Sequence, residues 1–351
     1  MSISKITLAA LTAVVAFSSC KKDVDPVIVI PPSTGSSITI NGLVGSEPGS
    51  SAGNSAFIDL SADKQTTVER KSWDLGFYAG SEFRVILNNT TSATAKVTSK
   101  TDINSVGMAD TAGYRGLAIG FDAESLSLVD DAAGDLTKTV IPVVSATEAD
   151  NKVVIINRGT GGAIAPRDWY KIRVLRSGTG YTLQYAKLTA TTFNTLAIAK
   201  DDNFSFIYAS FDNGLVSVEP EKKKWDFRWS YTLGKTFYNV INSDIPYASS
   251  DFITINYRAG VTAKEVLTST VSYNNFVLAN VAGLTFSGAF DVIGTNWRTA
   301  SPTPGASGVK TDRFYVIKDI AGNIYKLKFI SFHGDEGGTR GKPVFEYKLV
   351  Q

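Results

Sequence analysis

Apolar and polar residues alternate in short runs along most of this chain, with turn-forming residues between the runs. The run at residues 325–329 is typical, because Tyr325, Leu327 and Phe329 fall on one face and two lysines on the other. A period of two residues is what a half-buried strand requires. The same alternation recurs at residues 83–87, 171–176 and 252–257. These runs are rich in the β-branched and aromatic residues that strands favour, so the pattern predicts an all-β protein.

Two hairpins are nearly explicit in the sequence. Residues 171–176 should pair with residues 181–185 across a glycine-containing turn, and residues 314–318 should pair with residues 324–329 in the same way. The best helical candidate is the short segment 101–106, and no long stretch has a period of 3.6 residues. We therefore expect few helices, all of them short.

A segment of the chain is repeated. Residues 71–77 contain Trp73-Asp74 after a lysine, and residues 223–229 contain Trp225-Asp226 in the same setting. Further pairs of similar residues share one offset of 144 residues: Asp168 and Asp312, Gly178 and Gly322, Tyr181 and Tyr325, Leu183 and Leu327, Tyr185 and Phe329. The repeat predicts two tandem, related, antiparallel β-sandwich-like modules, at residues 38–200 and 201–351, each closing its apolar faces sheet on sheet. Two modules placed against each other enlarge a cleft, which favours binding over catalysis.

The N-terminus has the pattern of a bacterial lipoprotein signal. Residues 1–19 hold Lys5, an apolar run and small residues, and they end immediately before Cys20, the one cysteine of the chain. A lone cysteine at a cleavage point is suited to lipid attachment rather than to a disulfide. The polar, proline-bearing residues 20–37 predict a tether, so the folded part should begin near Ile38.

The composition changes this picture little. The formal net charge is +2, and loss of residues 1–19 removes Lys5 alone, which leaves +1. Such a balance provides no broad field for nucleic acid or for an anionic membrane surface, so we expect membrane contact through the lipid anchor only. With 43% apolar residues the chain can fill two hydrophobic cores.

Several segments carry a resemblance to a known family. Residues 203–208, 216–227, 308–319 and 341–350 resemble the HmuY family of Bacteroidetes surface lipoproteins. The resemblance implies a haem-binding protein, a haemophore, that takes haem from host haem proteins and passes it to a TonB-dependent outer-membrane receptor for iron acquisition. It also implies a lipid-anchored location in the outer membrane, facing the cell surface.

The haem ligands of this family are only partly matched. Relatives hold the iron between two histidines or methionines, whereas this chain has one histidine, His333, and one methionine beyond Met1, Met108. A site with two histidines from one chain is therefore excluded, and one His, a His–Met pair or a Tyr ligand remain open. Arg258 and Arg298 are candidates for the haem propionates. In the alternative interpretation His333 is a solvated loop residue and Met108 fills a gap in packing.

Signatures of catalysis are nearly missing from the sequence. A serine hydrolase would need His333 as its base, and no Gly-x-Ser-x-Gly motif accompanies it. No cluster of Cys and His residues predicts a zinc site, so we expect no metal beyond haem iron. We therefore do not expect an enzyme. The alternative to haem capture is a cell-surface binding or assembly lipoprotein that keeps the scaffold without haem ligation and binds a glycan, a peptide or a protein.

Overall fold

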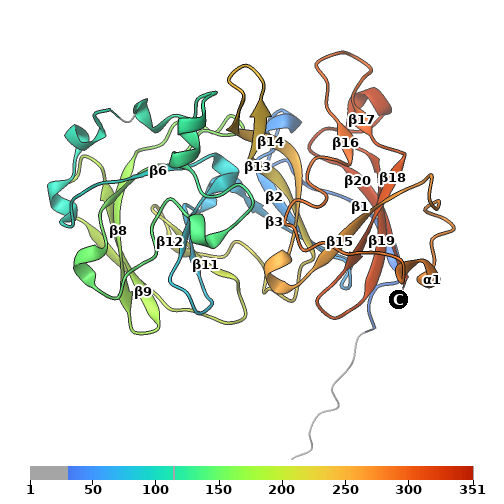
Figure 1. Cartoon of the computed structure of the whole chain (residues 1–351), viewed down its shortest axis with the longest axis horizontal. Helices are drawn as coiled ribbons and strands as arrows, with labels where there is room; N and C mark the ends of the chain where they lie inside the picture. Colours follow the sequence, from blue (N-terminus) through green and yellow to red (C-terminus); the bar gives the residue numbers. More distant parts are fainter. Residues whose placement is uncertain (1–30, 114, 351) are drawn as a thin grey trace, which may run out of the picture. The chain divides into compact units, whose positions relative to one another are not determined.

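In a computed structural model of the chain, residues 31–113 and 115–350 are described, and they form an all-β structure (Figure 1). Every strand pair in these two ranges is antiparallel. The α-helix described, α1 (Leu278–Val281), has four residues, and the helical candidate at residues 101–106 forms a 3-10 turn at Ile103–Ser105. The predicted fold class is confirmed. Within the described ranges no helix has the length and apolarity needed to cross a membrane.

Two five-stranded sheets form the outer layers. The first has the order β10-β9-β8-β7-β6 and contains β6 (Thr94–Val97), β7 (Val154–Asn157), β8 (Tyr170–Ser177), β9 (Gly180–Lys187) and β10 (Asn194–Ile198). The second has the order β1-β20-β19-β18-β15 and contains β1 (Gly35–Thr39), β15 (Thr262–Leu267), β18 (Arg313–Lys318), β19 (Ile324–Ser331) and β20 (Val344–Leu349). Both predicted hairpins are confirmed, as β8–β9 and β18–β19.

Two four-stranded sheets form the inner layers, and each mixes strands from both repeats. One has the order β12-β11-β4-β5, with β4 (Leu75–Tyr78), β5 (Val85–Leu87), β11 (Phe206–Ser210) and β12 (Gly214–Val216). The other has the order β14-β13-β2-β3, with β2 (Asn54–Asp59), β3 (Lys64–Glu69), β13 (Phe227–Tyr238) and β14 (Ser243–Ile255). A small sheet of β16 (Arg298–Thr299) and β17 (Gly308–Val309) completes the structure. The repeats therefore exchange their first hairpins: β2–β3 adds to β13, and β11–β12 adds to β4.

Three apolar interfaces hold the four layers together. From left to right in Figure 1 they are the first outer core, between the first outer sheet and the sheet of β4 and β11, then the central interface between the two inner sheets, and then the second outer core, between the sheet of β2 and β13 and the second outer sheet. Because side chains alternate along a strand, Ile58 of β2 faces the second outer sheet while its neighbour Phe57 faces the other inner sheet. The same alternation places Ala209 of β11 in the first outer core and Tyr208 in the central interface. Each repeat thus belongs to a sandwich, as predicted, but the two sandwiches also share a buried central layer.

The first repeat motif is held by a set of backbone and side-chain hydrogen bonds. Asp74 N–H donates to the carbonyl of Ala209 at 2.9 Å, and the Asp74 carboxylate accepts from Phe211 N–H at 2.8 Å. Asn88 N–H donates to the Asp74 carbonyl at 3.1 Å, and the Asn88 amide donates to the Trp73 carbonyl at 2.7 Å. These bonds fix β4 against a strand from the other repeat.

The second motif reproduces this set bond for bond. Asp226 N–H donates to the carbonyl of Ile58 at 2.7 Å, and its carboxylate accepts from Leu60 N–H at 2.7 Å. Asn256 N–H donates to the Asp226 carbonyl at 2.8 Å, and the Asn256 amide donates to the Trp225 carbonyl at 2.9 Å. The shared hydrogen bonds show that the sequence repeat is a structural repeat.

The segment boundaries predicted from the sequence agree with the structure to different degrees. Signal residues 1–19 and Cys20 lie outside the described residues. Residues 35–37, which we assigned to the tether, belong to β1 and pair with β20, so the fold begins earlier than Ile38. The boundary near residue 200 falls between β10 and β11, but the inner sheets combine strands from both sides of it. The modules at residues 38–200 and 201–351 are therefore repeats within one body rather than separately closed sheets.

Candidate functional site

A cavity of about 130 Å³ lies between the two inner sheets. Both repeat tryptophans line it, and each packs edge-on against an aromatic ring supplied by the other repeat. Trp73 meets Tyr208 with ring centroids 4.8 Å apart, and Trp225 meets Phe57 at 5.1 Å. The hairpin exchange places these four rings, so the cavity is a product of the duplication.

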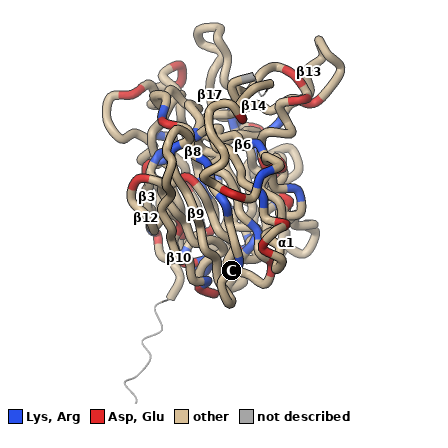
Figure 2. The backbone as a smooth tube through the Cα atoms, turned by 90° about the vertical axis from the view of Figure 1, so that its left-hand side faces the viewer, with Lys and Arg blue, Asp and Glu red and all other residues tan. Residues whose placement is uncertain are grey.

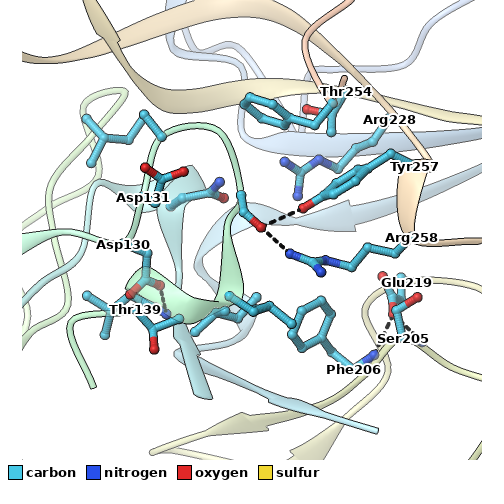
Figure 3. Close-up of a pocket in the computed structure, with 18 of the residues that line it drawn as sticks. Asp130, Asp131, Thr139, Ser205, Phe206, Glu219, Arg228, Thr254, Tyr257 and Arg258 are labelled. Atoms are coloured by element: carbon cyan, nitrogen blue, oxygen red, sulfur yellow. Dashed lines mark hydrogen bonds between the residues drawn. The ribbon is translucent and has the colours of Figure 1, made fainter. Parts of the chain in front are cut away.

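Two arginines from the second repeat bring positive charge to this cavity. Arg228 is on β13, and Figure 3 shows its guanidinium pointing into the cavity. Arg258 follows β14, and both Arg258 and Tyr257 donate to the carbonyl of Gly134, the latter at 3.1 Å. The segment 130–139 thereby closes one side of the cavity, because Tyr257 and Arg258 hold it at its midpoint.

The carboxylates of the cavity are already hydrogen-bonded. Glu219 accepts from the N–H groups of Ser205 and Phe206 at 3.1 and 2.9 Å and from the Tyr208 hydroxyl at 3.3 Å. Burial raises the pKa of Glu219 to about 7, because desolvation outweighs these hydrogen bonds. Glu219 is thus partly protonated at neutral pH and is a weak counter-charge to Arg228.

Asp130 is a second buried carboxylate at the start of the closing segment. It accepts from Leu87 N–H at 2.7 Å and from Val140 N–H at 2.9 Å. Burial raises the pKa of Asp130 to about 6. Its hydrogen bonds anchor the segment to β5, which leaves little capacity for a ligand.

Of the haem-binding residues predicted from sequence, His333, Met108, Arg258 and Arg298, only Arg258 lines the cavity. Arg298 lies 3.5 Å from the carboxylate of Asp251 and over the ring of Phe332, away from the cavity. Tyr170 does not line the cavity either, because its ring stacks on Phe211 between the first outer sheet and its inner sheet, with centroids 4.3 Å apart.

The two candidate iron ligands also lie elsewhere. His333 begins the 3-10 turn Gly334–Glu336, and its Nδ1 accepts from Asp335 N–H at 3.3 Å. Met108 is 58% exposed and begins a 3-10 turn in the segment between β6 and β7. These turns belong to different repeats, and their segments lie at opposite ends of the view in Figure 1. The structure therefore brings neither residue to the cavity.

Arg228 and Glu219 were missed by the sequence reasoning, although one signal existed. When the two Trp-Asp motifs are aligned, Arg228 falls on Gly76, so the repeats differ in charge at this position. Glu219 has no counterpart that identifies it. In the described part of the chain, no group of three or more His, Cys, Asp or Glu side chains is arranged to hold a metal ion.

Charged residues of both signs are mixed along the backbone in the view of Figure 2. This mixture agrees with the small formal net charge of +2.

The comparisons with known proteins identify one family. The family model described as HmuY protein matches residues 51–347, across both repeats. Searches of curated proteins and of solved structures gave no match.

Proposed function

Because this chain belongs to the HmuY family, a haemophore-type binding family, we propose that it is a cell-envelope protein that binds a small ligand in the cavity between its repeats. The observation that carries the proposal is the construction of the cavity, which both Trp73 and Trp225 line. Enclosed, mostly apolar sites with a few convergent polar groups are typical of small-molecule binding. The ligand is held by packing and charge, with neither His333 nor Met108 at this site.

Two observations favour this function over iron-ligated haem. His333 and Met108 do not line the cavity. In addition, about 130 Å³ is below the roughly 300–1,000 Å³ of sites that enclose drug-sized ligands. The cavity as it stands is suited to a ligand smaller than a porphyrin.

Haem capture is the second candidate function, and family membership favours it. In this function the chain takes haem from host haem proteins, with His333 or Met108 on the iron, and passes it to a TonB-dependent receptor. The haem then lies outside the cavity, against the turns that carry these residues.

The N-terminal sequence supports an anchored location for either function. Cys20 carries the lipid after removal of residues 1–19, and the protein is attached to the outer membrane at the cell surface. A Cys20→Ser variant is expected in the soluble fraction of fractionated cells, and a variant that stays with the outer membrane would contradict the anchor.

The cavity proposal is tested by identifying what the protein retains. The Cys20→Ser protein is incubated with a small-molecule extract of growth medium, washed, denatured and examined by mass spectrometry for released compounds. The matched control, Leu136→Trp, fills the cavity from the closing segment. We expect a compound that the parent protein retains and the Trp variant does not; equal retention by both would refute the cavity as the site.

Haem binding is tested separately by absorbance. Titration of the Cys20→Ser protein with haem gives a saturable, shifted Soret band if the iron is ligated. Loss of the band in His333→Ala or Met108→Ala would identify the ligand, and a flat titration excludes this second function.

A further inference from the structure

Arg228 is a cation in the cavity without a hydrogen-bonding partner. Its guanidinium donates to no other residue in the described ranges 31–113 and 115–350, and its Nε is shielded from solvent. A buried charge without partners is costly, so such groups are normally paired. The other arginine of the cavity, Arg258, differs because it donates to the carbonyl of Gly134.

The groups facing Arg228 do not neutralise it. Glu219 is the nearest acid by charge interaction, but no ion pair joins the two, and its oxygens already accept from Ser205, Phe206 and Tyr208. Tyr208 and Tyr257 also interact with Arg228, and burial raises the pKa of both phenols, so they stay neutral. The oxygens of Glu219 are therefore occupied, while the guanidinium of Arg228 donates to no residue that the structure describes.

Two further donors from residues that line the cavity are also unpartnered in the described structure. Thr254 lies directly opposite Arg228 on the β13–β14 ladder, so the two side chains share one face of the sheet. The hydroxyl of Thr254 and the indole N–H of Trp225 are buried without a partner in the described structure, and both residues line the cavity. A ligand that satisfies this side must supply acceptors.

The first repeat shows that this arrangement is not required for folding. The positions equivalent to Arg228 and Thr254 are Gly76 and Ile86, which pair with each other on the β4–β5 ladder. The same scaffold is therefore built with no polar side chain at either position. Besides Arg228 and Thr254, the lining of the cavity includes the aromatic rings of Phe57, Phe206 and Trp225.

We infer that the cavity binds a small aromatic or apolar carboxylate, with its carboxylate on Arg228 and Thr254 and its apolar part among the rings of Phe57, Phe206 and Trp225. This inference rests on the proposed function, because it names the ligand class of the same cavity. Arg supplies a planar fork of donors that matches the two oxygens of a carboxylate. A porphyrin propionate presents the same group, so the test separates the two sources.

The test compares three probes by calorimetry on the Cys20→Ser protein: phenylacetate, its neutral isostere phenylacetamide, and metal-free protoporphyrin IX. We expect phenylacetate to bind and the amide not to bind. Arg228→Leu should weaken phenylacetate about 10- to 100-fold, as loss of a charge-assisted hydrogen bond implies. Arg228→Lys should retain part of the affinity, and Lys223→Leu, which removes an exposed charge of the same segment, should leave it unchanged.

Thermal unfolding separates a binding role from a structural one. Without ligand, Arg228→Leu should melt at the same temperature as the parent or higher, because it removes a half-buried charge that has no hydrogen-bonding partner among the described residues. Phenylacetate should raise the melting temperature of the parent and not that of the variant.

Each outcome decides the inference. Binding of protoporphyrin alone, lost in Arg228→Leu, supports carboxylate recognition and assigns the carboxylate to a propionate. Equal binding of acid and amide, unchanged binding by Arg228→Leu, or no binding of any probe overturns the inference. The cavity function survives those last results if the parent protein retains a compound that Leu136→Trp does not.

Discussion

Arg158 binds the carboxylate of Asp74 at two points, with Nε 2.7 Å from Oδ1 and Nη2 3.0 Å from Oδ2. Both side chains are almost fully buried, and Arg158 also reaches Asp212 at 2.6 Å. Burial alone would lower the pKa of Arg158, but the hydrogen bonds to Asp212 and Asp74 outweigh it and raise the pKa. The equivalent aspartate of the second repeat, Asp226, has no ion pair within the described residues. The two copies of one motif therefore differ in their electrostatics.

Asp74→Asn should destabilise the protein strongly. The variant keeps the shape of the side chain but leaves the buried Arg158 with only Asp212, whose side chain is 55% exposed. Removing one partner of a buried ion pair typically costs about 3–5 kcal/mol. Urea unfolding at pH 7 measures the loss.

The control for that experiment is Asp212→Asn, which removes the exposed partner. It should cost no more than about 1 kcal/mol, as exposed pairs do. An Asp74→Asn variant as stable as Asp212→Asn would contradict the assigned role of the buried pair.

Asp226→Asn should have an effect that depends on pH. Burial raises the pKa of Asp226 to about 8, and the nearby Asp319 and Asp59 add to the rise. Because this folded-state pKa is above the unfolded value near 4, protonated Asp226 favours folding fully below pH 4, and that contribution is lost as the pH rises through 8. The Asn variant stays neutral and retains an oxygen for Leu60 N–H, so it should be more stable than the parent at pH 9. Urea unfolding at pH 5 and pH 9 measures the difference, and a variant less stable at pH 9 would refute the assignment.

The Trp-Asp repeat could be found from sequence because Trp73 and Trp225 stand in matching local context, and period-two alternation predicted the strands around them. The asparagines that complete each motif could not be found. Asn88 follows its aspartate by 14 residues and Asn256 by 30, so no common spacing connects them. The exchange of hairpins between the repeats could not be predicted from the sequence either. The alternation of apolar and polar residues shows which face of a strand is buried but not which repeat provides the neighbouring strand.

The position of the candidate site between the repeats was predicted from the sequence, but only one of its residues, Arg258, was. A cleft between repeats was expected, and the cavity lies there. Arg258 lines it, whereas His333, Met108 and Arg298 lie elsewhere. Residue type alone selected them, whereas Arg228 is distinguished by its missing partners. This lack of hydrogen-bonding partners can be recognised only in the structure, where the two inner sheets are packed together.

The exchange of hairpins predicts that neither repeat folds by itself. In a fragment of residues 31–200, β4 loses its neighbour β11, and the apolar face of β2–β3 loses β13. Each fragment should be insoluble or unfolded when produced separately, and fragments 31–200 and 201–351 should form a soluble 1:1 complex when produced together. Size-exclusion chromatography measures the formation of the complex, and circular dichroism measures folding. The control is the full chain, folded first and then cleaved between Asp201 and Asp202, which are both exposed. Cooperative unfolding of the lone 31–200 fragment would contradict the exchange.

Glu219 should make carboxylate binding depend on pH if Arg228 takes the carboxylate. With its pKa near 7, Glu219 is neutral at pH 5.5 and ionised at pH 8.5, where it competes for Arg228 and repels the ligand. Tyr208 and Tyr257 do not titrate in this window, since burial raises their pKa values. Asp130, with its pKa near 6, also becomes charged and adds to the repulsion. Phenylacetate affinity should therefore fall from pH 5.5 to pH 8.5, and calorimetry at both values measures it.

The matched variant for this pH effect is Glu219→Gln. The glutamine oxygen still accepts from Ser205 and Phe206, since both bonds go to one oxygen of the carboxylate. The variant should lose most of the pH dependence and bind more tightly than the parent at pH 8.5. An unchanged pH profile would show that another group is responsible.

Gly134 controls how tightly the segment 130–139 closes the cavity. Its φ of +74° is in the left-handed region, and an added Cβ would lie 2.2 Å from the Tyr257 hydroxyl. Gly134→Ala strains the backbone and forces the Tyr257 hydroxyl and the segment apart, so we expect it to weaken the hydrogen bond from Tyr257 to the Gly134 carbonyl. Hydrogen exchange of residues 130–139 should become faster, while exchange in β8 and β9 stays unchanged. The control is Gly178→Ala in the β8–β9 turn, where φ is also positive but no atom lies near the added Cβ. Faster exchange in the segment with Gly178→Ala, or unchanged exchange with Gly134→Ala, would show that these contacts do not hold the cavity closed.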